Sequence, residues 1–290
     1  MDGTPINYVE PKMTTMASQN IYDNTSFFEE YNKYPRSAQG LPAVVEWPLL
    51  RPMLPRSFCG LSVLDLGCGE GWFCRWAMSQ GAARVCGMDV SRNMLDLACK
   101  LTTASVSAEM DHHKKMPVCT STMFRQVDLE ALQLNNEREA FDVVFSGLAL
   151  HYVANLGGAI NEVFKALRPG GSFVFSVEHP IFTAPRRPGF VVQKPEQGEK
   201  HPEYQHGTVS GGSTIDAKSR TSSSSNSCWP LTDYLDEGGR TVDWLGASVQ
   251  KQHRTLSRSV YVILFILLLP CYVTLVTRKL PWSMFEATKN

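Results

Sequence analysis

One stretch of the sequence decides the fold: Val63-Leu64-Asp65-Leu66-Gly67-Cys68-Gly69-Glu70-Gly71. Its apolar first half is stopped by glycines, which is typical of a short buried strand over residues 62–66. Glycine at such a turn lets the backbone come close to a ligand, because no side chain intervenes. The stretch therefore predicts a strand, a ligand-binding loop and then a helix over residues 72–80.

Strand-like and helix-like segments alternate on either side of this loop. Short apolar runs predict five strands, at 62–66, 84–88, 124–127, 141–145 and 172–177. Helices are expected at 20–36, 42–55, 72–80, 96–101 and 161–167, and a long surface loop at 104–122. Alternation of this kind indicates a parallel sheet covered on both faces, with ligands bound at the carboxyl ends of its strands.

The spacing of the glycines separates two classes of ligand. A dinucleotide site needs G-x-G-x-x-G, with the pyrophosphate at the helix N-terminus. Here the pattern is G-x-G-x-G, Trp72 stands where the third glycine is needed, and Asp65 precedes the loop. A carboxylate there repels a pyrophosphate but suits a ligand with an ammonium group. A nicotinamide-dependent oxidoreductase is therefore the weaker interpretation.

Two further acids follow the next two predicted strands. Asp89 ends the second strand, where a carboxylate can accept hydrogen bonds from both hydroxyls of a ribose. Asp128 ends the third strand, where an acid can accept from an exocyclic amine such as that of adenine. Each also has a structural interpretation, because either can cap the helix that follows it. Ammonium, ribose and adenine together describe S-adenosylmethionine.

Four segments carry a resemblance to a known family. They are VLDLGCGEGWFCRWA (63–77), VCGMDVSRNML (85–95), FDVVFSGLALHYV (141–153) and LRPGGSFVFSVEHPIF (167–182). Together they resemble the class I S-adenosylmethionine-dependent methyltransferases, in the methyltransferase-11-like branch that acts on small molecules. The flanks resemble one subfamily of bacterial and fungal methyltransferases, so that the likeness covers about residues 18–205 and 228–257.

The resemblance implies an α/β fold, a Rossmann-like sheet of strand order 3-2-1-4-5 plus edge strands, with helices on both faces. It places Asp65, Gly67 and Gly69 at the methionine end of S-adenosylmethionine, Asp89 at the ribose and Asp128 at the adenine. Ser146 or Leu148 would line the methyl channel, and Tyr22 with nearby aromatic residues would form a lid. Aromatic faces attract a sulfonium as they attract other cations.

His151 is the candidate catalytic residue. A sulfonium methyl is already activated, so the enzyme has to align an acceptor lone pair and exclude water, and a base is needed only for a poor nucleophile. His151 follows the fourth strand and could act as that base, or it could simply pack beside Tyr152. Glu178 and His179 follow the fifth strand and could orient an acceptor or form a turn with Pro180.

Composition narrows the class of protein and its partners. The chain has 290 residues, 43% of them apolar, with 28 basic and 28 acidic side chains. It can bury a large core, and it is neither a collagen nor a disulfide scaffold. Zero formal charge argues against a nucleic-acid partner held by a strong positive field. Eight cysteines without a CxxC pair indicate reduced thiols and no metal site, and the absence of a secretory signal makes the cytoplasm the expected location.

The chain divides by composition into a main domain with additions. We expect a disordered leader at 1–18, a methyltransferase domain at 19–206, a Ser/Gly-rich disordered insertion at 207–227, the rest of the domain at 228–257, and an atypical apolar tail at 258–290. As one helix, residues 260–276 would span only about 25 Å, less than a bilayer core of about 30 Å. Membrane contact through this segment is open but not favoured over a packed helix and strand, and an altered gene model is the third interpretation.

These observations predict methyl transfer from S-adenosylmethionine to a small organic acceptor, with secondary metabolism suggested by family analogy alone. The alternative is a non-catalytic accessory or regulatory protein that binds S-adenosylmethionine and has a degenerate C-terminus. The methylated atom and the oligomeric state are left open by the sequence.

Overall fold

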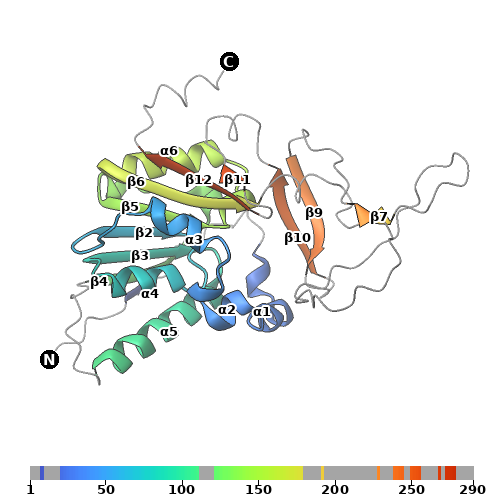
Figure 1. Cartoon of the computed structure of the whole chain (residues 1–290), viewed down its shortest axis with the longest axis horizontal. Helices are drawn as coiled ribbons and strands as arrows, with labels where there is room; N and C mark the ends of the chain where they lie inside the picture. Colours follow the sequence, from blue (N-terminus) through green and yellow to red (C-terminus); the bar gives the residue numbers. More distant parts are fainter. Residues whose placement is uncertain are drawn as a thin grey trace, which may run out of the picture.

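The computed structural model describes residues 7–9, 20–110, 121–178, 191–192, 227–228, 238–244, 249–255, 267–268 and 272–278. Its centre is a set of five parallel strands, β2 (Ser62–Leu66), β3 (Arg84–Asp89), β4 (Ser121–Gln126), β5 (Phe141–Gly147) and β6 (Leu167–Glu178). They lie in the order β4-β3-β2-β5-β6, shown in Figure 1. This confirms the predicted order 3-2-1-4-5 and the Rossmann-like α/β class.

Both ends of the chain supply edge strands to this sheet. β1 (Asn7–Val9) pairs in parallel with β4, although a disordered leader was expected there. β12 (Tyr272–Arg278), from the apolar tail, pairs antiparallel with β6, and β11 (Leu267–Leu268) pairs with β12. The N–H and C=O groups on the outer side of an edge strand can pair with another strand, and β1 and β12 pair with the outer sides of β4 and β6.

The tail is therefore strand where the structure describes it, and the single helix considered over 260–276 is wrong for residues 267–268 and 272–276. Within the described ranges, no helix combines the length and the apolar character needed to cross a membrane. The other proposed domain boundaries stay predictions. Two small antiparallel pairs lie outside the main sheet, β9 (Gly238–Trp244) with β10 (Val249–Thr255), and β7 (Val191–Val192) with β8 (Ser227–Cys228).

Three longer helices cover the sheet. α4 (Trp72–Ser79) and α5 (Arg92–Met110) pack on one face, and α6 (Leu156–Ala166) on the other (Figure 1). The expected loop over 104–122 is wrong at its start, because α5 continues to Met110 through a stretch without glycine or proline. α6 starts five residues before the expected 161, where the Asn155 side chain accepts from the Gly158 N–H and caps the helix.

Short helical pieces precede the sheet and border the site. The amino-terminal pieces are η1 (Ile21–Asp23), α1 (Thr25–Tyr31), α2 (Pro35–Gln39), η2 (Leu41–Ala43), α3 (Trp47–Leu50) and η3 (Arg51–Met53). The later ones are η4 (Leu129–Ala131), η5 (Asn135–Glu137) and η6 (Leu150–Tyr152). The two continuous helices expected at 20–36 and 42–55 are split, because a proline opens α2, η2, α3 and η3.

Successive side chains of β2 point to opposite faces of the sheet and belong to two different hydrophobic clusters. Val63 packs with the side chains of α4 and α5, whereas Leu64 and Leu66 pack in the cluster that includes α6. The side chain of Asp65 points to the same face of the sheet as that of Val63 and lies under α4. There the Cys74 thiol donates to Asp65 Oδ2 at 3.4 Å. The main chain after Leu66 leaves the sheet at the edge where the carboxyl ends of β2 to β6 converge.

Candidate active site

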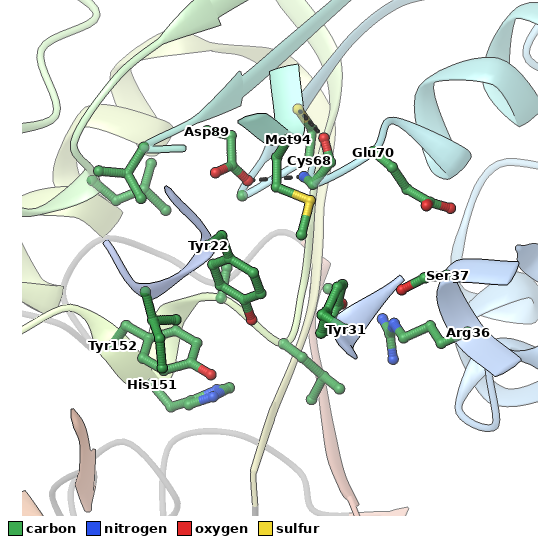
Figure 2. A pocket seen from close by; sticks show the side chains of 18 of the residues that line it. Tyr22, Tyr31, Arg36, Ser37, Cys68, Glu70, Asp89, Met94, His151 and Tyr152 are labelled. Atoms are coloured by element: carbon green, nitrogen blue, oxygen red, sulfur yellow. Dashed lines mark hydrogen bonds between the residues drawn. The ribbon is translucent and has the colours of Figure 1, made fainter. Parts of the chain in front are cut away.

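A cavity of about 410 Å³ lies at that edge, within the range of about 300–1,000 Å³ that is usual for ligand pockets. Figure 2 shows the side chains of 18 of the residues that line it. The lining residues are Ile21, Tyr22, Tyr31, Tyr34, Arg36, Ser37, Gly67, Cys68, Gly69, Glu70, Trp72, Asp89, Val90, Met94, Asp128, Leu129, Gly147, Leu148, Ala149, His151, Tyr152, Val153 and Glu178.

The cavity brings together seven of the nine predicted site residues: Tyr22, Gly67, Gly69, Asp89, Asp128, Leu148 and His151. The other two, Asp65 and Ser146, are not in its lining, and the side-chain alternation of their strands is the reason. Asp65 points under α4, as described above. The Ser146 hydroxyl donates to the Leu66 carbonyl at 2.8 Å, so it ties β5 to β2 instead of facing a methyl channel.

The glycine loop is shaped by positive φ angles, +70° at Gly67, +53° at Gly69 and +76° at Gly71. The N–H groups of Gly67 and Cys68 both donate to the Met88 carbonyl, which fixes the loop to the end of β3. A Cβ at Gly67 would lie 2.3 Å from the Ala149 Cβ, whereas a Cβ at Gly69 would meet nothing within 4 Å. Gly67 is therefore required for packing, and Gly69 leaves open space beside the cavity.

This difference predicts separate effects for two matched variants. Gly67→Ala should lower the free energy of unfolding by about 2–4 kcal/mol, because backbone strain and the overlap with Ala149 add. Gly69→Ala carries only the strain, about 1–2 kcal/mol, but its methyl group enters the ligand space and should weaken cofactor binding. Urea unfolding and calorimetric titration measure the two effects. Equal losses of stability in both variants would contradict the packing role of Gly67.

Asp89 faces the cavity with its carboxylate held by two backbone groups. Oδ2 accepts from the Gly69 N–H at 2.8 Å, and Oδ1 accepts from the Ser91 N–H at 2.9 Å. The cap of α5 is Ser91, whose hydroxyl oxygen accepts from the Met94 N–H. Burial raises the pKa of Asp89 to about 6, and the hydrogen bonds from Ser91 and Gly69 oppose that rise. A carboxylate has about four acceptor positions, so these backbone contacts leave part of its capacity for a ribose.

Asp128 combines its two predicted roles. Its Oδ1 accepts from the Glu130 N–H at 2.9 Å and caps η4, and the residue also lines the cavity. Capping uses part of the acceptor capacity of a carboxylate, which leaves the rest available to a ligand.

Asp65 is predicted to make stability depend on pH. Burial raises its pKa to about 7, above the value of about 3.9 in an unfolded chain. The folded chain therefore retains a proton that the unfolded chain releases, so this group's contribution to stability falls as the pH rises from about 4 to about 7. Asp65→Asn should remove that slope and raise the free energy of unfolding at about pH 8 by about 1–3 kcal/mol.

Thermal unfolding across this pH range is the measurement, with Asp142→Asn as the control. The Asp142 carboxylate accepts from the Ser62 N–H at 2.8 Å and from Arg168 at 2.7 Å, so its loss should destabilise the chain. A wild-type melting temperature that rises toward about pH 8 would contradict the assignment.

Leu148 adopts a left-handed backbone conformation, with φ of +54°. Its N–H donates to both the carbonyl and the hydroxyl oxygen of Ser176, at 3.0 and 3.1 Å, which holds this uncommon conformation in place. Strain of this kind concentrates at functional sites, and here it turns the chain after β5 toward the cavity. The identity of residue 148 in the sequence does not signal this geometry.

The segment that carries Tyr22 is held by a contact that the sequence does not signal. Asp23 Oδ1 accepts from the Ser91 hydroxyl at 2.6 Å and from the Asn93 N–H at 3.0 Å, so η1 is attached to the start of α5. Tyr22 therefore lies over the cavity, with its ring centroid 5.1 Å from that of Tyr31 (Figure 2). Nothing in local spacing links residue 23 to residues 91–93, which are brought together only by the fold.

His151 is 1% exposed, and its Nε2 lies 3.9 Å from Glu178 Oε2. Its ring centroid lies 4.2 Å from that of Tyr152, so it both packs and faces the cavity. Glu178 was one of the possible acceptor-orienting residues, while His179 and Pro180 lie outside the described residues. Among the side chains that the structure describes, no group of three or more His, Cys, Asp or Glu is placed to hold a metal ion.

The site fits S-adenosylmethionine on its own geometry. Acids stand at the ends of neighbouring strands, a glycine leaves open space between them, and tyrosines cover the opening. Sequence reasoning missed several lining residues, notably Arg36, Ser37, Glu70, Trp72 and Met94. Of these, Glu70 and Trp72 adjoin the glycine loop and could have been inferred from it.

Comparison with known proteins agrees with this geometry. A family model described as a methyltransferase domain matches residues 64–175. A structure of an S-adenosylmethionine-dependent methyltransferase from Mesorhizobium loti is 33% identical, covers 83% of this chain and 100% of its own, and has a TM-score of 0.56. A structure from Listeria monocytogenes that is assigned to the same class is 28% identical, covers 81% and 98%, and has a TM-score of 0.53.

Curated relatives fall into two kinds. An uncharacterised Haemophilus influenzae protein is 29% identical over 81% of this chain and 77% of its own length. The malonyl-[acyl-carrier protein] O-methyltransferase of Erwinia billingiae is 32% identical, but over only 40% of this chain and 39% of that protein. Fold, site and near-complete coverage of the Mesorhizobium structure lead to one conclusion: the chain belongs to the class I S-adenosylmethionine-dependent methyltransferases, and S-adenosylmethionine is its cofactor.

Proposed function

We propose that the chain methylates a small organic acceptor that binds between His151, Tyr152 and Glu178. The observation that carries this proposal is the placement of a buried histidine and a carboxylate at the ends of β5 and β6, beyond the acids at the ends of β3 and β4. Further assignment to secondary metabolism rests on family analogy alone.

The size and surroundings of the cavity support a small acceptor. At about 410 Å³, the cavity lies toward the small end of the range of about 300–1,000 Å³ that is usual for ligand pockets. β10 contacts η6, the element that carries His151. A zero formal charge gives no general attraction for nucleic acid.

The chain's own residues would position the acceptor and manage its proton. When bound, S-adenosylmethionine supplies a methyl group activated on a sulfonium. Tyr22 and Tyr31 exclude water from the part of the cavity beside the glycine loop. His151 accepts a proton from an acceptor that must be deprotonated. Glu178, 3.9 Å from His151 Nε2, stabilises the imidazolium that results.

The direct test is transfer of label from methyl-labelled S-adenosylmethionine by the purified full chain. A low-molecular-mass extract should supply a labelled product with the wild type and not with a variant that fails to bind the cofactor. Label that appears only in protein or nucleic acid would contradict a small acceptor. Tight cofactor binding without any labelled product would favour the alternative, a non-catalytic accessory protein.

A further inference from the structure

We propose that the methyl acceptor is a small organic amine, which binds as its ammonium cation beside Glu178 and is methylated on nitrogen. The inference rests on the methyltransferase function proposed above and names the chemical class of its acceptor. It starts from the distribution of charge along the carboxyl edge of the sheet, where the cavity lies.

Glu178 gives the acceptor side of the cavity a negative charge. It is the last residue of β6, whereas the other three carboxylates of the described lining lie at or after the ends of β4, β3 and β2. Those three are Asp128, Asp89 and Glu70. The side chain of Glu178 is 25% exposed, so its carboxylate is largely shielded from bulk water. A shielded charge attracts an opposite charge more strongly than a charge in water does.

The positive charge nearest to this side is already offset by a partner. Among the described residues that line the cavity, Arg36 is the single arginine or lysine. Its guanidinium donates to Glu46 Oε1 at 2.7 Å, and Glu46 is 1% exposed, so the two charges form a pair. An acidic acceptor would therefore be repelled by Glu178, whereas an ammonium group would be attracted to it.

Tyrosine rings border the same space. A side-chain hydrogen bond joins Tyr152 to Tyr22, and the ring of Tyr22 lies 5.1 Å from that of Tyr31, with the two planes at 81°. Figure 2 shows Tyr22, Tyr152 and His151 gathered on one side of the cavity, with Glu70 on the other. The faces of aromatic rings attract an ammonium group within about 6 Å. Tyrosines together with a carboxylate are therefore suited to an organic cation.

The same residues account for the proton that the acceptor must lose. An ammonium nitrogen has no lone pair, so it must be deprotonated before it can be methylated. His151, whose Nε2 lies 3.9 Å from Glu178 Oε2, accepts that proton and passes it to solvent. The nitrogen lone pair forms the new N–CH3 bond, and the electron pair of the broken S–CH3 bond returns to sulfur. The products are a methylated ammonium ion and an uncharged thioether, and no further reactant is needed.

The class of the acceptor can be tested before its identity is known. A low-molecular-mass extract is divided at neutral pH by a cation exchanger, and the bound and unbound fractions are each supplied to the full chain with methyl-labelled S-adenosylmethionine. Labelled product, separated from unreacted cofactor, is expected with the bound fraction and not with the unbound one. Fragmentation of this product in a mass spectrometer should place the label on nitrogen.

Glu178→Gln tests the residue with the acceptor that this fractionation yields. The variant should raise the acceptor KM by about 10- to 100-fold, because a contact with a charged group is lost, and should keep the cofactor Kd within about 2-fold. Glu178→Asp keeps the charge and should recover part of the loss. The control is Glu30→Gln, because Glu30 forms an exposed pair with Lys33 at 2.6 Å outside the cavity lining, and its removal should change neither constant.

Labelled product from the unbound fraction alone, or label on oxygen, carbon or sulfur, would overturn the inference and leave methyl transfer to a small acceptor intact. An unchanged acceptor KM in Glu178→Gln would also overturn it, because the carboxylate would then not face a cation. Cofactor binding without labelled product from either fraction would instead refute the proposed function, and the inference with it.

Discussion

His151→Gln is expected to lower kcat by about 10²- to 10⁴-fold for an acceptor that must lose a proton, the usual contribution of a positioned base. Glutamine keeps a planar polar side chain but cannot take up a proton. His151 follows β5, whereas Asp89 and Asp128 follow β3 and β4, on the other side of β2. The cofactor Kd should therefore change by no more than about 2-fold.

The acceptor found by labelled transfer makes this measurable in steady state, together with the pH dependence of the rate. The wild-type rate should fall on acidification, because a protonated imidazole cannot accept a proton. The rate of the variant should not show this fall at acidic pH. Glu178→Gln is the companion variant, with an expected loss of about 10-fold, since the contact of 3.9 Å stabilises a charge rather than moving a proton. Full activity in His151→Gln would mean that the acceptor needs alignment alone.

Asp89→Asn is expected to weaken cofactor binding by about 100- to 1,000-fold. Hydrogen bonds to a charged group contribute about 1.5–3 kcal/mol each, and a ribose offers two donors to this carboxylate. Some stability should be lost as well, about 1–3 kcal/mol, because an asparagine oxygen can accept from only one of the Gly69 and Ser91 N–H groups and its NH2 group would face the other.

Calorimetry over a pH series distinguishes a direct contact from a general disturbance. Burial places the pKa of Asp89 at about 6, so protonation should weaken wild-type binding as the pH falls through that value. Asp89→Asn should lack this dependence. Asp96→Asn is the control, because Asp96 forms a surface pair with Arg92 at 3.2 Å and lies outside the cavity lining. A loss under about 3-fold in Asp89→Asn would show that the ribose is held elsewhere.

Local sequence patterns were enough to predict the central sheet and seven of the residues that line the cavity. The apolar run at 62–66, the glycines after it and the acids after the next two strands are each encoded within a few residues. Parallel strands bring their carboxyl ends to one edge, so a position at the end of a strand already implies a place near the ligand. That is why Gly67, Gly69, Asp89 and Asp128, which the sequence places near the ligand, all line the cavity.

Strand position alone did not tell which face a side chain takes. Asp65 and Ser146 were expected in the site, but the first lies under α4 with Cys74 and the second bonds to Leu66. A shift of one residue in a strand exchanges the two faces, so a place near the end of a strand does not tell whether a side chain lines the cavity.

The sequence by itself determined the parallel core, the loop and the cofactor class, because those features are written in short spacings. Only the tertiary structure decided which distant segments complete them. Arg36 is held at the cavity by its ion pair with Glu46, and η1, which carries Tyr22, is held by the contact of Asp23 with Ser91 at the start of α5. The tail supplies β12, which pairs with β6. Hydrogen bonds and ion pairs form between groups that the fold places within about 3 Å of each other, and no local periodicity encodes that proximity.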